Sequence, residues 1–505
     1  MNQSIAGGLL VFGASLLACY RLWLHPLQKF PGPVLAAITG WYRVYYTAID
    51  GEGWVAHLEK LHQLYGPVIR VTPTELHFNN PDAFDDIHVT PKPSYIKDPE
   101  FYGSFATPDS LVSQADPRKA SKRRHLLGSY FSRRSVLQLE HLVQLTCAPT
   151  SRQVDTLIER LSTYAKTRKP ADLFLAYRAM TLDIITSYLF AQRFNALDYP
   201  EFRHPLLVGL DDSLRALWLG RYLPIQLDKW LPESFLRKAA PKMIPMLDQA
   251  GYIAGKLDEI STNPPSLQDV GHKAIFSVLF DTSKSDTGGD PWVFPRAQVI
   301  DECVTLQFAG SDTVANTCMV GTYELLKNKE ALNQLRKELD RAWPDPHTPM
   351  NWEALEKLPY LGAVIKESLR LSYGVASPLP RQVGSSDTVI AGVPVPAKTI
   401  VSCGTYFVQN DPDIFPDPKK FKPERWLNEE SRALEKYLVA FSKGPRICLG
   451  INLAWCELYL IFANVFRKLD FELWNTAEDD LKFLDFFLPL YTGNHLHAHV
   501  KVRNP

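Results

Sequence analysis

Apolar residues along much of the chain recur at three- and four-residue intervals, the spacing that places them on one face of an α-helix. This pattern extends from about residue 116 to residue 330. Residues 68–79 instead alternate around a turn, which predicts two short strands. Residues 260–292 carry Asn-Pro-Pro and Asp-Thr-Gly-Gly turn signals and are predicted to be exposed loop. No repeat or composition shift marks a second domain. We therefore expect one large domain over 36–505, mainly α with a small β portion (α+β).

Two helices stand out in this pattern. The longer covers about residues 296–326, directly after Pro295, and about 30 residues at 1.5 Å each would cross a whole domain. Its middle contains Gly310, which costs roughly 1 kcal/mol relative to alanine inside a helix. One interpretation is an irregularity accommodated on a polar face. The second helix is an apolar segment over about residues 449–468.

The first 24 residues differ from the rest. Residues 5–20 carry no charge, and Arg21 and further basic residues follow directly. With Arg21 extending its charge toward the interface, residues 1–24 are long enough for a membrane-spanning anchor. The positive charge that follows places the rest of the protein in the cytosol. A cleaved signal peptide and a lipoprotein site over 16–19 are the alternatives, but no basic residue precedes the apolar run. Residues 25–35 are rich in proline and predict a stiff hinge.

Charge and cysteine content exclude several classes of protein. Lys plus Arg and Asp plus Glu number 55 each, so the strong basic excess of a nucleic-acid-binding protein is absent. The cysteines are odd in number and form no C-x-x-C pair, which argues against a disulfide framework or a zinc ribbon and favours a reducing compartment. They are Cys19, Cys147, Cys303, Cys318, Cys403, Cys448 and Cys456.

Cys448 is the cysteine with the clearest chemical context. It lies at the start of the 449–468 helix, where backbone N–H groups favour a thiolate, and a Gly- and Pro-containing loop precedes it. A cysteine thiolate is an axial ligand of haem iron in some proteins. Gly444 and Gly450 would let the backbone pass close to a flat cofactor. The alternative for a single cysteine is a small buried hydrophobe. We adopt that interpretation for Cys303, Cys318, Cys403 and Cys456.

The segment Phe441-x-x-Gly444-x-Arg446-x-Cys448-x-Gly450 resembles the haem-binding signature of the cytochrome P450 family. Three further motifs of that family follow the expected chain order: Ala309-Gly310-x-Asp312-Thr313, Glu367-Ser368-Leu369-Arg370 and Pro423-Glu424-Arg425-Trp426. The resemblance covers essentially the full length. Residues 25–33 are similar to those of filamentous-fungal members from secondary-metabolite pathways.

This resemblance implies a cytochrome P450 fold and haem b, iron protoporphyrin IX, with Cys448 as its axial thiolate ligand. It makes Thr313 the oxygen-activating threonine and Asp312 its acidic partner, and a hydroxyl beside a carboxylate suits proton delivery. It also gives a structural triad. Glu367 and Arg370 lie three residues apart, so they share one helical face, and Arg425 joins them.

The resemblance further implies cationic partners for the haem propionates. Arg446 and Arg381 match two such positions. Arg124 matches a third, but Ala120 stands where the family has tryptophan, so Arg123 remains an alternative to Arg124. Phe441, Gly444 and Gly450 complete the cofactor-binding set. The basic cluster of Lys119, Lys122, Arg123, Arg124, Arg133 and Arg134 is either a solvated face or the docking face for an acidic reductase.

The implied activity is insertion of one oxygen atom of O2 into a lipophilic small molecule by hydroxylation or epoxidation, in one or several steps. The implied partners are NADPH-cytochrome P450 reductase and the endoplasmic reticulum membrane, without nucleic acid. The substrate-contact segments are mostly apolar, which suits a terpenoid, meroterpenoid or polyketide. They are part of 101–113, Phe308, Ala309, 377–379 and 487–490. Two alternatives are a haem-thiolate isomerase or dehydratase that needs no NADPH, and a non-catalytic haem-binding protein.

Three histidines near the C-terminus alternate along the chain: His495, His497 and His499. On a strand this spacing puts all three imidazoles on one face. A metal site is one interpretation, but no acid or cysteine supports it nearby, so we expect an exposed strand face.

Overall fold

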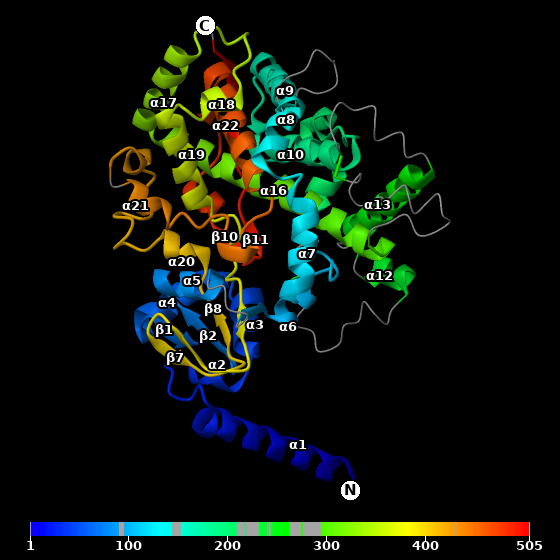
Figure 1. The fold of residues 1–505 in the computed structure, drawn as a ribbon, viewed down its shortest axis with the longest axis vertical. Helices are drawn as coiled ribbons and strands as arrows, with labels where there is room; N and C mark the ends of the chain where they lie inside the picture. The colour runs from blue at the N-terminus through cyan, green and yellow to red at the C-terminus, as the bar shows by residue number, and fades with distance from the viewer. Residues whose placement is uncertain are drawn as a thin grey trace.

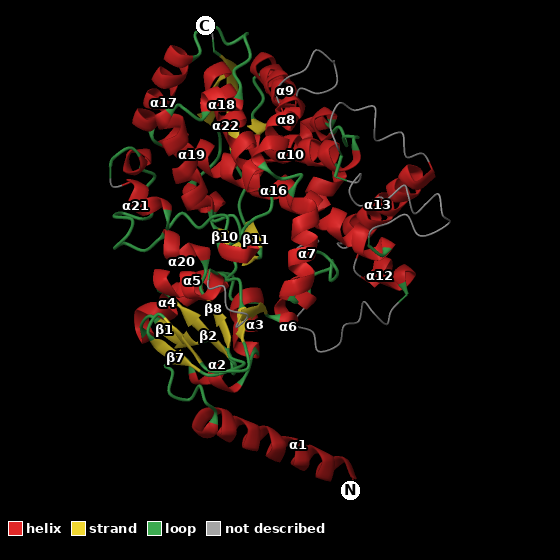
Figure 2. Ribbon diagram, viewed as in Figure 1, coloured by secondary structure: helices red, strands yellow, loops and turns green. Residues whose placement is uncertain are grey.

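A computed structural model describes residues 2–89, 95–143, 153–209, 232–239, 244–262, 294–429 and 431–503, with Trp218, Pro241 and 274–275. Helices make up most of the body, and the strands gather mainly at the end of the molecule nearest the N-terminal helix (Figure 2). The fold is mainly α with a small β portion, as the sequence predicted. Cys147 and most of the predicted exposed loop at 260–292 lie outside the described residues. The prediction is wrong for 260–262, which belong to a helix, and for Ala274 and Ile275, which are buried.

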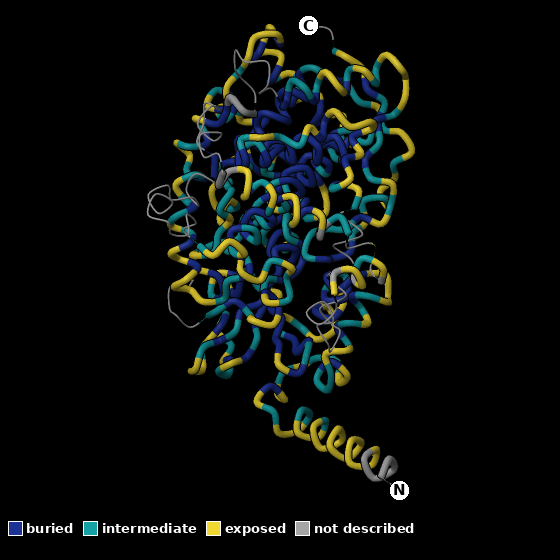
Figure 3. Tube along the Cα trace, turned by 90° about the vertical axis from the view of Figure 1, so that its right-hand side faces the viewer, coloured by how far each residue is buried: buried dark blue, intermediate teal, exposed yellow. Residues whose placement is uncertain are grey.

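The N-terminal segment forms one continuous helical stretch that projects from the body (Figures 1 and 3). Helix α1 (Asn2–Cys19) continues as a π-helix over Tyr20–Leu24. Within it, Gly7–Leu24 is apolar and uncharged enough to span a membrane, with mean hydropathy 1.5 and none of it buried. The other described helix that passes this test, α10 (Leu173–Phe190), is fully buried and is a core helix. Gly7–Leu24 is therefore the candidate membrane span.

The helical layer is organised around α16 (Arg296–Lys327), which starts directly after Pro295 as predicted. It is continuous through the 309–313 segment, so no irregularity marks Gly310. An added Cβ at Gly310 would lie 2.7 Å from Cγ1 of Ile185 on α10. The glycine is therefore explained by the close approach of two buried helices, a tertiary contact that local sequence does not reveal.

Helices α13, α17, α19 and α22 contact α16, whereas α2–α5 lie beside the strands at the end of the molecule nearest the N-terminal helix (Figure 1). Helix α22 (Ile451–Lys468) begins two residues later than predicted. The other helices of the body are α2 (Val34–Ile38), α3 (Trp41–Ala48), α4 (Trp54–Tyr65), α5 (Pro81–His88), α6 (Pro99–Gly103), α7 (Pro117–Gly128), α8 (Arg133–Val143), α9 (Gln153–Thr167), α12 (Glu233–Ala239), α13 (Ile244–Thr262), α17 (Lys329–Ala342), α18 (Trp352–Leu355), α19 (Pro359–Ser372), α20 (Thr405–Gln409) and α21 (Ser431–Glu435).

The largest sheet has the strand order β1-β2-β8-β5-β3. Strands β1 (Val68–Arg70) and β2 (Glu75–Phe78) form the predicted antiparallel pair. Next to β2 lies β8 (Ile400–Ser402), which is parallel to it and comes from much later in the chain. Beyond β8 lie β5 (Arg381–Val383) and then β3 (Tyr95–Lys97). This sheet brings the 95–97 and 381–383 segments side by side, which matters for the cavity described below.

Two hairpins and a three-stranded sheet complete the β portion. The hairpins are β6 (Thr388–Ile390) with β7 (Val393–Val395), and β10 (Phe483–Phe486) with β11 (Leu488–Tyr491). In the three-stranded sheet, β12 (His497–Val502) lies between β4 (Ala171–Asp172) and β9 (Leu469–Leu473). Two of the three alternating histidines, His497 and His499, lie on a strand as expected, but they are half-buried rather than exposed. The expectation was wrong for His495, which precedes β12 and has a left-handed φ of 55°.

Candidate active site

A large cavity lies between α16 and the loop that contains Cys448. The volume that the centre of a water molecule can reach inside it is about 700 Å³, far larger than a packing defect. Its walls come from α16, α7, the 102–112 segment, the cysteine loop, the start of α22 and the turn at 487–488. These elements are distant in sequence, so the cavity exists only in the folded protein.

Cys448 opens directly onto this cavity. Its backbone N–H donates to the carbonyl oxygen of Phe441 at 2.9 Å, which closes the loop below the thiol. The side chain is exposed because it borders the cavity, while the surrounding protein raises its pKa by desolvation. A hydrogen bond from Gly450 and the charge of Arg124 oppose that increase. Among the described residues, no other cysteine lines the cavity, and Cys303, Cys318, Cys403 and Cys456 are buried.

The two glycines of the cysteine loop, Gly444 and Gly450, lie in different surroundings. Gly444 has φ +68°, and a Cβ there would lie 2.2 Å from the carbonyl oxygen of His88, so glycine is required by a backbone contact with α5. Gly444 does not line the cavity, although the sequence predicted a role for it beside the cofactor. Gly450 does line it, and a Cβ added there would meet only the ring of Phe131, at 4.0 Å. Phe441 lines the same wall.

Four cationic side chains converge on one side of the cavity. Arg124, Arg381 and Arg446 were predicted there, and Lys97 of β3 was not. Lys97 Nζ donates to the carbonyl oxygen of Val112 at 2.6 Å, and Arg381 donates to the Tyr102 hydroxyl at 2.8 Å. Burial, then repulsion from Arg381, lowers the pKa of Arg446 to about 10. Burial also lowers the pKa of Lys97 well below its usual value, with the three arginines contributing.

The structure distinguishes Arg124 from its neighbour. Arg124 lines the cavity and donates to the carbonyl oxygen of Ile447, next to Cys448, at 2.6 Å. Arg123 turns away and forms a buried ion pair with Glu302 at 3.3 Å. The predicted basic cluster is therefore not a single surface. Its exposed members are Lys119, Lys122, Arg133 and Arg134.

These groups fit the haem that the sequence led us to expect. Nη1 of Arg446 is buried and has no hydrogen-bond partner, which is costly unless an anion completes the site. Three more cations lie around it, and two carboxylates of a propionate pair would offset their mutual repulsion. Cys448 supplies a thiol that lines the same cavity. The donor set thus matches a flat, dianionic group with an iron at its centre.

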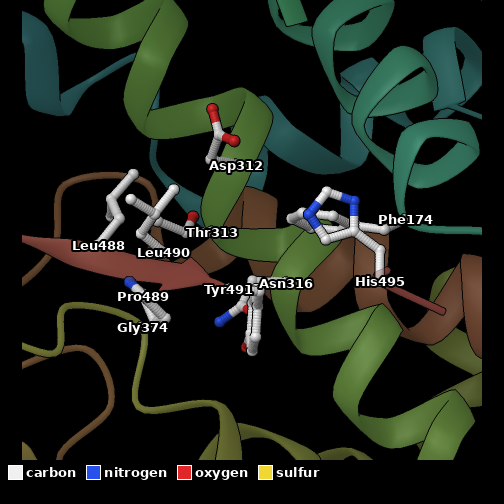
Figure 4. Close-up of a pocket in the computed structure, with 10 residues that line it drawn as sticks. All are labelled: Phe174, Asp312, Thr313, Asn316, Gly374, Leu488, Pro489, Leu490, Tyr491 and His495. Atoms are coloured by element: carbon white, nitrogen blue, oxygen red, sulfur yellow. The ribbon is translucent and has the colours of Figure 1, made fainter. Parts of the chain in front are cut away.

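Thr313 and Asp312 are adjacent on α16, but only Thr313 lines the large cavity. Thr313 lines the large cavity, and its hydroxyl donates to the carbonyl oxygen of Ala309 at 2.9 Å. Asp312 lines a much smaller pocket that Thr313 shares (Figure 4). Its carboxylate pairs with Nε of the fully buried Arg178 at 2.7 Å and accepts from the Ser311 hydroxyl at 3.0 Å. Arg178, on α10, was not identified from the sequence.

Glu367, Arg370 and Arg425 meet in the core beside the cavity. Arg370 donates to both carboxylate oxygens of Glu367 at 2.9 Å, and Arg425 donates at 3.1 Å. The indole N–H of Trp426 and the backbone N–H of Lys422 also donate to this carboxylate. Glu367 and Arg370 are fully buried. Every lone-pair direction of the buried carboxylate is thereby occupied, which is the arrangement that a buried charge needs.

Apart from these polar groups, the wall of the cavity is mainly apolar. An aromatic group that includes Phe105, Trp218 and Phe487 forms one wall, with ring centroids 4.9–6.3 Å apart. The hydroxyls of Thr107 and Thr305 are hydrogen-bonded across the cavity margin at 2.8 Å. Trp218 and Thr305 were not predicted from the sequence. Thr305 lies one helical turn before Ala309, so the period of α16 could have identified it, whereas no local signal points to Trp218.

Comparisons with known proteins agree with this geometry. The model of the family described as Cytochrome P450 matches residues 38–493. The chain is 33% identical to the cytochrome P450 monooxygenase TRI4 of Trichoderma arundinaceum, over 94% of this chain and 91% of that protein. It is 34% identical to the cytochrome P450 monooxygenase astB of Aspergillus terreus, over 92% and 91%. It is 32% identical to the conidiogenone synthase PchP450 of Penicillium rubens, over 98% and 100%.

Members of this family hold haem iron through a cysteine thiolate and generally act on lipophilic substrates with electrons from a reductase. Fold, cavity and sequence relationship all point the same way, and the chain belongs to the cytochrome P450 family of monooxygenases.

Proposed function

We propose that the protein inserts one oxygen atom of O2 into a lipophilic metabolite in fungal secondary metabolism, by hydroxylation or epoxidation and in one or more steps. The observation that carries this proposal is the apolar, aromatic-walled cavity into which Cys448 and Thr313 both open. A cavity wall of this kind selects its substrate by shape and by apolar contact. A terpenoid or meroterpenoid skeleton suits it, with a polyketide as a third class.

The proposed roles of the residues follow from their positions. Cys448 is the axial ligand of haem b, and Phe441 and Gly450 border the ring beside it. Arg446, Arg381 and Arg124 hold the propionates, and Lys97 joins them. The haem, when bound, supplies the oxygen-activating chemistry. The protein supplies a dry apolar space, a fixed thiolate and a proton source at Thr313. Because these groups are already in position, they need not rearrange during the reaction.

Replacing Arg446 with glutamine is expected to speed haem loss about tenfold, because a charge-assisted contact to a propionate contributes roughly 1.5 kcal/mol. The measurement is the rate of haem transfer to excess apomyoglobin. Arg118→Gln is the matched control, since Arg118 is exposed on α7 and does not line the cavity. Equal rates in the two variants would contradict the propionate assignment.

Thr313→Ala is expected to retain haem but to convert NADPH largely into hydrogen peroxide, because the hydroxyl that hands on protons is gone. Product and peroxide are measured per NADPH consumed. Thr313→Ser, which keeps a hydroxyl, should stay close to wild type. An unchanged yield of product per NADPH in Thr313→Ala would show that this hydroxyl has no part in the reaction.

The proposal includes the setting of the enzyme. Residues 1–24 anchor it in the endoplasmic reticulum membrane, 25–35 form a hinge, and 36–505 form the catalytic domain on the cytosolic side. NADPH-cytochrome P450 reductase is the electron donor. Its docking surface includes the exposed cations Lys119, Lys122 and Arg134, close in sequence to Arg124 at the cavity.

The test of function uses the full-length protein in microsomes with the reductase, NADPH and a panel of terpenoid, meroterpenoid and polyketide precursors under ¹⁸O2. A product carrying one ¹⁸O atom per oxidation supports the proposal. Product formation that needs neither NADPH nor O2 would instead identify an isomerase or dehydratase. Haem-loaded protein that transforms no member of the panel would count against this substrate range.

A further inference from the structure

Three polar side chains interrupt the apolar wall of the large cavity where α16 meets the 102–112 segment. Glu302 and Thr305 lie three residues apart on α16 and therefore share one helical face. Thr107 belongs to the 102–112 segment and is hydrogen-bonded to Thr305. All three line the cavity, and none of them is among the residues proposed above to hold the haem. Polar groups in such a wall need hydrogen-bond partners, so the partners that the protein supplies must be identified first.

Only one oxygen of the Glu302 carboxylate has hydrogen-bond partners within the part of the chain that the structure describes. Oε2 accepts from the backbone N–H of Leu111 at 2.9 Å and from Nη1 of Arg123 at 3.3 Å. These two bonds explain how the 102–112 segment is tied to α16, but they leave Oε1 without a donor. Burial raises the pKa of Glu302 to about 7, against the opposing charge of Arg123. Oε1 is therefore an acceptor of raised proton affinity at the cavity wall.

The two threonine hydroxyls add a donor and a further acceptor. Thr305 Oγ1 donates to Thr107 Oγ1 at 2.8 Å, and the hydroxyl of Ser110 donates to the same oxygen at 3.4 Å. A hydroxyl that accepts two hydrogen bonds can still donate its own proton, and no described residue accepts the proton of Thr107. Thr305 has used its proton but keeps its lone pairs. The site thus offers one donor, at Thr107, and acceptors at Thr305 and Glu302.

An alcohol hydroxyl is the group that matches this set. It can accept from Thr107 and at the same time donate to Glu302 or Thr305. An ether or carbonyl oxygen would satisfy Thr107 alone, and an ammonium group has no lone pair for it. A carboxylate would place a second negative charge beside Glu302. A hydrocarbon would leave every one of these groups without a partner, at a cost in binding free energy.

We propose that Glu302, Thr305 and Thr107 bind a hydroxyl group that the substrate already carries. The substrate is then an apolar skeleton that has been hydroxylated once, and not a bare hydrocarbon. This inference rests on the proposed function and specifies its substrate class. An oxygenation that installs the hydroxyl must come first, and it is carried out either by another enzyme or by an earlier turnover of this one.

The position of the site along α16 determines which carbon is oxidised. Thr305 precedes Ala309 by four residues and Thr313 by eight, and both of these residues line the same cavity. At 1.5 Å per residue these separations are about 6 Å and about 12 Å along the helix axis. The bound hydroxyl therefore lies away from the proposed proton source at Thr313. We expect the new oxygen on a carbon several bonds from the existing hydroxyl, and not on its neighbour.

The test compares three matched probes: the tricyclic alcohol cedrol, its methyl ether and the parent hydrocarbon cedrane. Their dissociation constants are measured by equilibrium dialysis against the haem-loaded, full-length protein, so that the result does not depend on turnover. Thr305→Val should weaken the binding of cedrol about fivefold, the effect of a lost neutral hydrogen bond, and leave cedrane unchanged. Thr305→Ser, which keeps the hydroxyl, should bind cedrol as the wild type does.

Glu302→Gln tests the acceptor directly, because it exchanges the unpaired oxygen for an amide N–H group. Loss of a hydrogen bond to a charged group should weaken the binding of cedrol about tenfold. The methyl ether has no proton to donate, so its binding should not weaken. If this variant does not load haem, Thr305→Val decides the question.

Thr317→Val is the matched control. Thr317 also lies on α16 and lines the cavity, but its hydroxyl donates to the carbonyl oxygen of Thr313 at 3.2 Å and is hydrogen-bonded to the hydroxyl of Ser372 at 2.9 Å. Its replacement should change the binding of cedrol and cedrane by the same factor. A second pair, an alcohol and its hydrocarbon on the larger kaurane skeleton, guards against a poor fit of the first.

The outcomes distinguish this inference from the proposed function. The hydroxyl site is overturned if neither alcohol binds, or if the ratio of alcohol to hydrocarbon dissociation constants is the same in wild type, Thr305→Val and Glu302→Gln for both skeletons. A wild-type protein that binds the alcohols as expected but oxidises no compound would refute the proposed function and leave the site in place. Under ¹⁸O2, conversion of a hydrocarbon to alcohol and then to diol would identify this enzyme as the source of the first hydroxyl, and diol from supplied alcohol alone would identify an earlier enzyme.

Discussion

Cys448→Ser is expected to abolish the strongly red-shifted Soret band of the reduced, carbon-monoxide-bound protein, together with all measurable oxygenation. A serine hydroxyl stays protonated under conditions in which a cysteine can ligate iron as a thiolate, so the electron donation that favours O–O cleavage is lost. The substitution removes no packing volume of consequence, because the side chain already faces open space.

Cys456→Ala is the control for this prediction. Cys456 lies on α22, eight positions further along the chain, and is fully buried away from the cavity. It should keep the red-shifted band with a slightly lower thermal midpoint. If Cys448→Ser retained the band, another residue would have to bind the iron, and the proposed cofactor site would be wrong.

Glu367→Ala is expected to give the largest loss of stability. It removes the carboxylate that accepts from Arg370, Arg425 and Trp426, and leaves the fully buried guanidinium of Arg370 without its counter-ion. Breaking a buried pair from one side costs about 3–5 kcal/mol. We expect a lower urea midpoint and little haem-loaded protein, because α19 also contributes Leu369 to the cavity wall.

Lys366→Ala provides the comparison, one residue earlier on the same helix. Lys366 pairs with Glu435 near the surface, where the glutamate side chain is 50% exposed. Solvent-screened pairs of this kind contribute about 0–1 kcal/mol. Unfolding midpoints are measured by urea titration and haem content by absorbance. Similar unfolding midpoints and haem contents in the two variants would show that the triad does not stabilise the fold.

The parts of the fold that follow from local spacing were predictable. The period of α16, its start after Pro295 and the alternation around 68–79 all depend on residues close in sequence. The pairing of Glu367 with Arg370 follows from three-residue spacing in the same way. The position of Arg425 beside them needed the family resemblance, because 55 residues separate it from Arg370.

The parts that depend on tertiary contact were not predictable. Lys97 joins the cation group only because β3 pairs with β5, which carries Arg381. Gly444 is explained by the backbone of His88, and Gly310 by Ile185, and neither partner is near in sequence. Thr313 lines the large cavity and Asp312 does not, and this difference depends on how α16 is rotated against its neighbours. The sequence motif identifies both residues, but it does not show which cavity each side chain lines.

The junction at the base of the N-terminal helix has a practical consequence for making the protein without detergent. Arg70 donates to the carbonyl oxygen of Arg21 at 2.8 Å, Arg21 donates to that of Ile38, and Leu27 is buried in the body. The last turn of the helical stretch is thus fixed to the globular part. A truncation that ends within the exposed stretch before Tyr20 would remove only exposed, mainly apolar surface. One that also deletes Arg21 would remove an acceptor of Arg70, which lies on the first strand of the main sheet.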